Sequence, residues 1–160
     1  MKLYLKQKVF SWNDKFTVYD EQGKDKYYVE GEFFSFGKKL HIYDLSGNEI
    51  AFIRQEVFSF LPKYYISFGG KEVATVKKHF TFFNHEFSVE GFGWSVSGDF
   101  FGHEYEINDN GRMAASVYKE WFTFGDAYAI DISDGVNEIS ALAVALIIDA
   151  VISAERNNNG

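Results

Sequence analysis

The sequence predicts a mainly β protein with one α-helix, folded as a closed β-barrel of about twelve strands around a central hydrophobic C-terminal helix. Two observations lead to this prediction. The segment 139–152 is apolar at twelve of its fourteen positions, and the chain before it carries a strand-like pattern that repeats every 24 residues. Each element needs the other, because both would otherwise expose large apolar surfaces to water.

The C-terminal helix has no polar face. At 100° per residue, Ser140 and Asp149 lie on opposite sides, so apolar side chains surround the helix axis. Fourteen helical residues span about 21 Å, which is shorter than the roughly 30 Å of a bilayer core and similar to strands of five or six residues. We therefore expect protein to enclose this helix, and we expect no transmembrane segment. Asp134 is the expected N-cap, with Glu138 in the first turn.

The 24-residue repeat organises the rest of the chain. In its first three copies, large apolar residues alternate along a segment that ends in a turn containing Gly. This alternation is typical of a strand with one buried face, and Gly supplies the positive φ that hairpin turns require. The phenylalanines that mark the repeat are Phe10, Phe34, Phe58 and Phe82. We expect one domain over residues 1–156, with its helix at about 136–155, and a flexible tail at 157–160.

Composition narrows the class of partner. A formal net charge of -7 opposes binding to nucleic acid, whose affinity depends on Lys and Arg that neutralise phosphates. The chain has no Cys, which excludes disulfides and thiolate chemistry. The segment 1–10 has lysines between its apolar residues and lacks the uninterrupted apolar stretch of a secretion signal, so we expect a cytoplasmic location.

Two segments and the apolar helix carry a resemblance to a known family. The segments are 38–51, KKLHIYDLSGNEIA, and 124–132, FGDAYAIDI. With the helix that follows, they resemble bacterial members of the LURP-one-related family, the YxjI-like group, and the resemblance covers nearly the whole chain. It implies the fold of tubby C-terminal domains and phospholipid scramblases, a barrel around a C-terminal helix. About activity it implies little: plant relatives are linked to defence, tubby domains bind phosphoinositide headgroups, scramblases act at membranes, and no catalytic motif carries over.

A headgroup site of the tubby kind would need basic side chains gathered on one surface. The candidates are Lys38, Lys39, Lys77 and Lys78. Neighbouring residues of a strand point to opposite faces, so each doublet places one Lys on a given face. Solvated strand edges are the alternative interpretation, and an acidic protein resists anionic membranes.

Asp149 is the polar anomaly of the helix. A carboxylate near the end of a buried helix needs hydrogen-bond donors, or its pKa rises and it stays neutral. Two interpretations stay open. The carboxyl is either structural and bonded to groups at strand ends, or it marks a functional cavity.

The sequence indicates no catalytic, cofactor-binding or metal-binding residue. His85 and His103 stand at equivalent places in two strands, each followed by Glu, but neither position has a chelating spacing. Neither a Gly-x-Ser-x-Gly elbow nor a phosphate-binding glycine loop occurs. We therefore expect a protein without metal or cofactor, and not an enzyme.

Aromatic residues cluster at the ends of the repeat units. They are Trp12, Phe58, Phe60, Trp121, Phe122 and Phe124. Trp12, Phe36 and Phe60 lie in register with Phe124 on the face of the repeat phenylalanines. We therefore expect these side chains to pack against the helix, with a surface-binding role as the alternative.

The leading expectation for function is a non-enzymatic binding or scaffold protein that engages a partner protein or a small ligand through loops at the barrel rim. One alternative is a peripheral membrane protein that binds phospholipid headgroups. The other is an enzyme that uses Asp149 or a rim carboxylate. Liposome sedimentation would test the first alternative, and a cavity with converging polar groups at one barrel end would favour the second.

Overall fold

A series of strands followed by one helix makes up the fold. The computed structural model describes residues 1–6, 15–32, 36–80, 86–122 and 125–159. In chain order the elements are β1 (Lys2–Lys6), β2 (Lys15–Tyr19), β3 (Asp25–Glu32), β4 (Lys39–Tyr43), β5 (Glu49–Gln55), β6 (Lys63–Phe68), β7 (Lys71–His79), β8 (Glu86–Glu90), β9 (Trp94–Asp99), β10 (Glu104–Asp109), β11 (Arg112–Phe122), β12 (Gly125–Ile132) and α1 (Glu138–Asn159).

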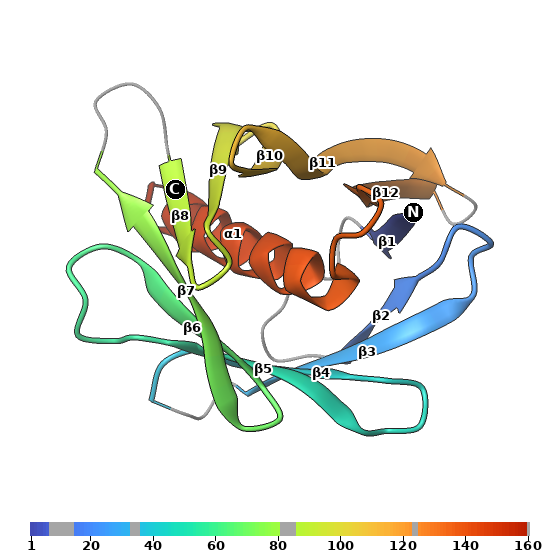
Figure 1. The fold of residues 1–160 in the computed structure, drawn as a ribbon, viewed down its shortest axis with the longest axis horizontal. Coiled ribbons are helices and arrows are strands. Elements are labelled where there is room, and N and C mark those ends of the chain that lie inside the picture. The colour runs from blue at the N-terminus through green and yellow to red at the C-terminus, as the bar shows by residue number, and fades with distance from the viewer. Residues whose placement is uncertain (7–14, 33–35, 81–85, 123–124, 160) are drawn as a thin grey trace.

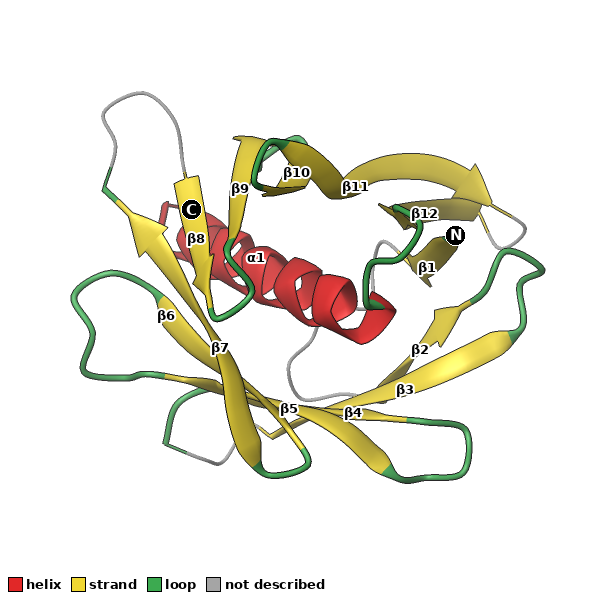
Figure 2. Ribbon diagram, in the orientation of Figure 1, coloured by secondary structure: helices red, strands yellow, loops and turns green. Residues whose placement is uncertain are grey.

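The twelve strands form one closed antiparallel barrel in sequence order. Strand β1 pairs with β2 and, in the register Leu3 to Ile130, with β12, which closes the sheet. Figure 1 looks into this barrel and shows α1 crossing its interior with strands on every side. Colouring by element type makes the single layer of sheet around the helix plain (Figure 2). The predicted closed barrel around a central C-terminal helix is confirmed.

The sequence repeat appears as a repeated hairpin. Strands β2 and β4 are followed by Asp20 and Asp44, whose Oδ1 atoms accept backbone N–H groups two and four residues further on at 2.9 Å. Gly23 and Gly47 complete these turns with φ of 78° and 85°, which L side chains rarely adopt. A bulge lies just before each turn, as shown by register shifts after Val18, Ile42, Ile66 and Ile107. The same local chemistry therefore builds several hairpins of the barrel.

The core lies between the helix and the inward face of the strands. Every residue of α1 from Ser140 to Ile152 is buried, and Leu142, Leu146 and Ile147 are 0% exposed. Burying a side chain of this size contributes about 1.5–3 kcal/mol, so the helix stabilises the barrel from inside. Within the described ranges, the structure contains no helix whose apolar length would suffice to span a bilayer.

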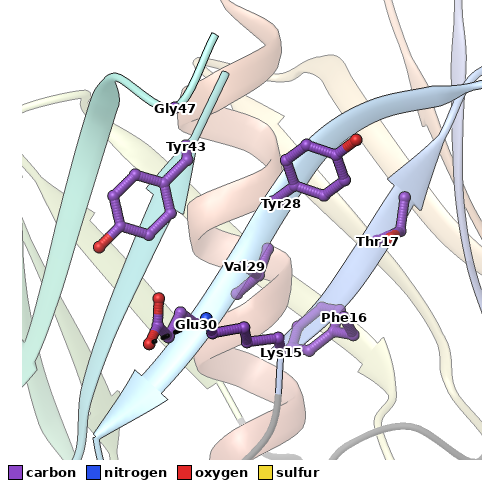
Figure 3. Close-up of a pocket in the computed structure, with 8 residues that line it drawn as sticks. All are labelled: Lys15, Phe16, Thr17, Tyr28, Val29, Glu30, Tyr43 and Gly47. Atoms are coloured by element: carbon purple, nitrogen blue, oxygen red, sulfur yellow. Dashed lines mark ion pairs between the residues drawn. The ribbon is translucent and has the colours of Figure 1, made fainter. Parts of the chain in front are cut away.

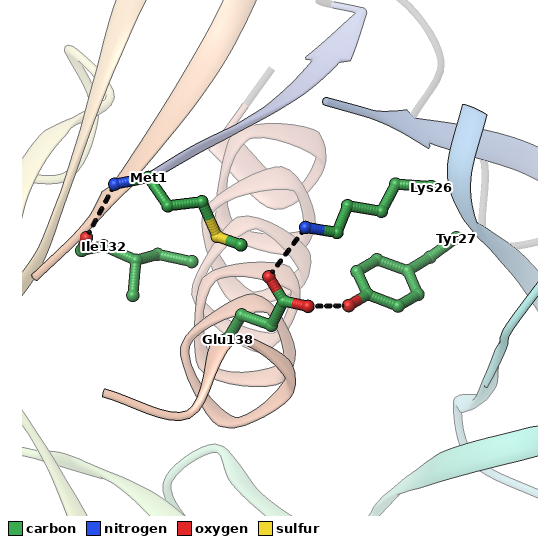
Figure 4. A network of polar contacts seen from close by, with 5 residues as sticks. All are labelled: Met1, Lys26, Tyr27, Ile132 and Glu138. Carbon is green, nitrogen blue, oxygen red and sulfur yellow. Dashed lines mark hydrogen bonds and ion pairs between the residues drawn. The ribbon is translucent and has the colours of Figure 1, made fainter. Parts of the chain in front are cut away.

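The start of α1 differs from the prediction. Asn137, and not Asp134, caps the helix, because its Oδ1 accepts the backbone N–H of Ser140 at 2.9 Å. Glu138 lies in the first turn, as expected, and accepts hydrogen bonds from Lys26 Nζ at 3.0 Å and from the Tyr27 hydroxyl (Figure 4). These contacts attach the helix start to β3.

The end of α1 also differs from the prediction. The helix continues to Asn159 instead of ending at about 155, so most of the expected flexible tail is helical. Extending an existing helix adds one backbone hydrogen bond for each residue fixed, even where the side chains are polar and exposed. Gly160 lies outside the described residues.

Candidate functional site

One end of the barrel collects the exposed aromatic side chains. Strands of an antiparallel barrel alternate in direction, so β1, β3, β5, β7, β9 and β11 all end, and the strands that follow them all begin, at the same end of the barrel. The C-terminal part of α1 lies there too, because Glu155 accepts from Lys78 and Arg156 donates to the carbonyl of Phe101. We call this end the aromatic rim and define it by Phe36, Phe58, Phe60, Phe80, Phe101 and Trp121.

The rim side chains are among the most exposed aromatic groups in the described residues. Their exposed fractions are 99% for Phe60, 85% for Phe58, 78% for Trp121, 77% for Phe36 and 71% for Phe80. The expectation that Phe36 and Phe60 pack against the helix is therefore wrong. Trp12 and Phe124, expected on the same face, lie outside the described residues.

The error has a physical cause. Alternation assigns side chains to two faces only while the chain stays in a strand, and Phe36, Phe58 and Phe60 lie in the connections between strands. The space beside α1 is already filled by inward side chains of the strands themselves. Phe122, which does lie at a strand end, stacks on Tyr4 with ring centroids 3.8 Å apart and not on the helix.

Ordered connections support part of the rim. Phe36 and Phe58 come from two connections, and their ring centroids are 5.9 Å apart. Nearby, the backbone N–H of Gln55 donates to the carbonyl of Lys38 at 2.8 Å, and the backbone N–H of Lys38 donates to Gln55 Oε1 at 3.1 Å. Gly37 has a φ of 86°, and a Cβ there would meet Val57 Cγ1 at 2.5 Å. The close approach of these two connections therefore requires glycine.

A second candidate lies on the outer wall, away from either end of the barrel. A hollow of about 360 Å³ lies over β2, β3 and β4. Tyr28 and Tyr43 lie on its sides (Figure 3). Lys15 and Glu30, which also line the hollow, form an ion pair with 3.8 Å between Nζ and Oε1. The pKa of Tyr43 is raised by burial and by the nearby carboxylates of Glu30, Glu49 and Glu32. This hollow is a tyrosine-lined surface with one ion pair, and not the cavity at a barrel end that would favour an enzyme.

Asp149 faces a histidine beneath the aromatic rim. Asp149 is 7% exposed and its Oδ1 lies 3.4 Å from Nδ1 of His103, which is 5% exposed and lies between β9 and β10. Among the described residues, no hydrogen-bond partner reaches Asp149 Oδ2 or His103 Nε2. Burial raises the pKa of Asp149 to about 7, with Arg156 acting in the opposite direction.

The pKa of the histidine in this pair is lowered, whereas that of the aspartate is raised. Burial lowers the pKa of His103 to about 4, helped by the positive charges of Arg156 and Lys119. At neutral pH the imidazole is therefore neutral while the carboxyl is close to its midpoint. The contact between Asp149 and His103, which directly precedes β10, agrees with the structural interpretation, in which the carboxyl meets a group at a strand end. The functional interpretation of Asp149 stays a prediction.

Comparison with known proteins decides the family. The model of the LURP-one-related family matches residues 1–149 of this chain. The chain belongs to the LURP-one-related family. It is 37% identical over 152 residues to the uncharacterized protein YxjI of Bacillus subtilis (strain 168), an alignment that covers 95% of this chain and 94% of that protein.

A crystal structure from Arabidopsis thaliana shares the fold of this family member. The match has a TM-score of 0.72 at 16% identity, and it covers 94% of this chain and 90% of the plant protein. At this identity, the likeness concerns the arrangement of strands and helix alone. It agrees with the barrel and central helix described above.

The four lysines proposed for a headgroup site do not form one cluster in this LURP-one-related protein. Lys38 and Lys39 lie at the start of β4 and Lys77 and Lys78 at the end of β7, with β5 and β6 between them. Lys77 pairs with Glu90 at 3.0 Å, and Lys78 pairs with Glu155 of α1, so this doublet points to two faces. Burial lowers the pKa of Lys38.

The histidines are likewise dispersed. His41 lies between Glu32 and Glu49, at 3.3 and 3.1 Å, and His79 contacts the Ser88 hydroxyl at 2.6 Å. His85 lies outside the described residues. In the part of the chain that the structure describes, no group of three or more His, Asp or Glu side chains could hold a metal ion.

Sequence reasoning named four of the six rim aromatics, Phe36, Phe58, Phe60 and Trp121, and assigned most of the aromatic residues to the core; it did not name Phe80 or Phe101. A usable signal was present, because Phe58 and Phe60 flank polar Ser59 and come shortly before Pro62, in a segment too irregular to continue a strand. Aromatic residues in such a connection are candidates for a binding surface.

Proposed function

We propose that this LURP-one-related protein is a non-enzymatic binding protein that engages its partner through the aromatic rim. The observation that carries the proposal is the almost complete exposure of Phe58 and Phe60 together with Trp121 at one end of the barrel. Exposing several large aromatic side chains at one place opposes solubility, so such patches in soluble proteins usually mark interaction surfaces. Aromatic residues are also enriched among the residues that dominate binding energy.

The closed barrel suits this role. Each strand is paired on both sides, and α1 fills the interior of the barrel. The rim connections therefore project from a rigid support. A rigid support lowers the entropy lost when exposed side chains bind. The proposal also places the protein in the cytoplasm and assigns it no catalytic activity, as expected from its sequence.

The proposal is tested by removing the rim aromatics while leaving the core intact. The variant Phe58→Ser/Phe60→Ser should fold normally, because both side chains are exposed. Leu45→Ser is the matched control, since Leu45 is 57% exposed in the β4–β5 turn at the opposite end. Each tagged full-length chain would replace the natural one in its host, and gentle lysis would be followed by size fractionation of the whole lysate.

The wild-type chain and Leu45→Ser should run with larger assemblies or membranes, and the double rim variant should shift to the size of the free chain. Circular dichroism would check that all three chains are folded. Wild-type protein that runs as a free chain, with the same profile as the double variant, would contradict a binding role for the rim.

A further inference from the structure

We propose that the partner of the aromatic rim is the interfacial region of a phospholipid bilayer, held by insertion of the aromatic tips and not by recognition of charged headgroups. This inference rests on the binding role proposed for the rim and specifies its partner. It differs from a headgroup site of the four lysines, which the structure leaves apart.

The distribution of the rim side chains favours a surface that can deform. Trp121 lies near the end of β11, and Phe36 and Phe58 come from two different connections of the barrel. Phe80 and Phe101 belong to two more. A helix or strand of a protein partner needs one continuous groove, whereas a bilayer accepts separate tips wherever they project. Aromatic side chains are favoured at the membrane interface, where the ring leaves bulk water without entering the hydrocarbon centre.

Charge is distributed unequally between the two ends of the barrel. The turns at the end opposite the aromatic rim carry Asp20, Glu21, Asp44, Asp109 and Asp134. Fewer basic residues lie at that end, among them Lys24, Lys71 and Arg112. Near the aromatic rim, acidic residues such as Glu32, Glu56, Glu104 and Glu120 are balanced by basic ones, at Lys6, Lys15, Lys39, Lys63, Lys119 and Arg156. A bilayer with anionic lipids would therefore repel the opposite end of the molecule more strongly than the rim, which orients the rim toward the membrane.

The rim itself is mixed in charge and not strongly basic. Three of its acidic groups are engaged locally: Glu30 pairs with Lys15, Glu155 with Lys78, and Asp99 accepts the N–H of Gly102 at 2.9 Å. Charge attraction can therefore supply orientation but little affinity, and the aromatic side chains must supply most of the binding energy.

The barrel is tall enough to keep its acidic end away from the membrane. Strands of about six residues hold the two ends roughly 17–20 Å apart, while the Debye length at physiological ionic strength is about 8 Å. The net charge of -7 is therefore largely screened at the membrane when the rim faces it. An acidic protein of this shape can dock on a membrane that a uniformly acidic one would avoid.

Vesicle co-sedimentation of the purified full-length chain tests the inference. The probes are vesicles of phosphatidylcholine alone and vesicles with added phosphatidylserine, each at low and high salt. The wild-type chain should sediment with both. Phe58→Ser and Phe60→Ser should each weaken binding about tenfold, equivalent to about 1.4 kcal/mol. Leu45→Ser should bind as the wild type does, and high salt should change wild-type binding less than either rim substitution.

Each other outcome has a defined meaning. Binding that requires phosphatidylserine, disappears at high salt and survives the rim substitutions would overturn the inference in favour of headgroup charge. Absence of vesicle binding would also overturn it. If rim substitutions still release the chain from a membrane-free assembly or from a dimer of this chain, the partner is a protein and the proposed binding role stands. If they change neither measurement, both proposals fail.

Discussion

Replacing Asp149 with Asn should make the protein more stable at high pH and have less effect at low pH. Asn has nearly the shape of a protonated Asp and cannot ionise, so the substitution removes the charge and leaves the packing almost unchanged. The reason for the pH dependence is burial, which raises the pKa of this carboxyl from 3.8 to about 7 in the folded chain.

The sign follows from the two protonation equilibria. Below pH 3.8 the carboxyl is protonated in both the folded and the unfolded chain. As pH rises from 3.8 to about 7, the unfolded chain loses the proton while the folded chain keeps it, so the stability of the wild type falls. Above about pH 7 both states are ionised and the folded chain carries the whole cost of a buried charge.

The magnitude follows from the same shift. Between pH 5 and pH 8 the folded carboxyl passes through its pKa of about 7, so the wild type loses stability over about two pH units. At about 1.36 kcal/mol for each unit, this amounts to about 2.7 kcal/mol, which relaxation of the surroundings lowers to about 2 kcal/mol. The stability advantage of Asp149→Asn over the wild type should therefore grow by about 2 kcal/mol from pH 5 to pH 8.

Urea unfolding at pH 5 and pH 8, followed by tryptophan fluorescence, measures this difference. Comparing the two pH values removes any constant effect of the amide on packing. His103 does not confuse the result, because its pKa of about 4 leaves it neutral in the folded chain at both pH values, and its titration in the unfolded chain is common to both proteins. Asp134→Asn, at an exposed site, is the control. An Asp149→Asn advantage that is equal at both pH values, or larger at pH 5, would refute the reasoning.

Two further predictions concern the helix. Leu146→Asp should abolish cooperative unfolding, because it places an unpaired charge at a site that is 0% exposed. The control Leu45→Asp, in an exposed turn, should unfold cooperatively. A cooperative urea transition for Leu146→Asp would contradict the enclosed helix. Asn137→Ala should lower the free energy of unfolding by about 1 kcal/mol, since the Asn137 side chain caps α1. Asp134→Ala should change it little, and the reverse order in urea denaturation would restore Asp134 as the cap.

The sequence was sufficient for the barrel and its central helix because both rest on local patterns. An apolar segment without a polar face must be enclosed, whatever encloses it, and its length excluded a bilayer before any pairing of strands was known. The repeated turns were also predictable, since the Asp and Gly of residues 20–23 and 44–47 specify their own backbone geometry.

Other features could not be predicted from the sequence, because they depend on where strands end and on which segments meet. Alternation placed Phe36 and Phe60 on the buried face, but the strands stop before these residues and the exposed connections begin. The cap of α1 moved from Asp134 to Asn137 for the same reason, because a difference of a few residues in the start of a helix is invisible to apolar periodicity.

The amino-acid order thus determined, by itself, that a helix without a polar face would be enclosed by strands of matching length, since apolar surface and residue spacing are properties of the chain alone. Only the tertiary structure decided that exposed aromatic side chains share one end of the barrel and that Asp149 meets His103 beneath them. Closure of the sheet produces both results, because it brings connections distant in sequence to a common rim and fills the interior before the rim aromatics can enter it.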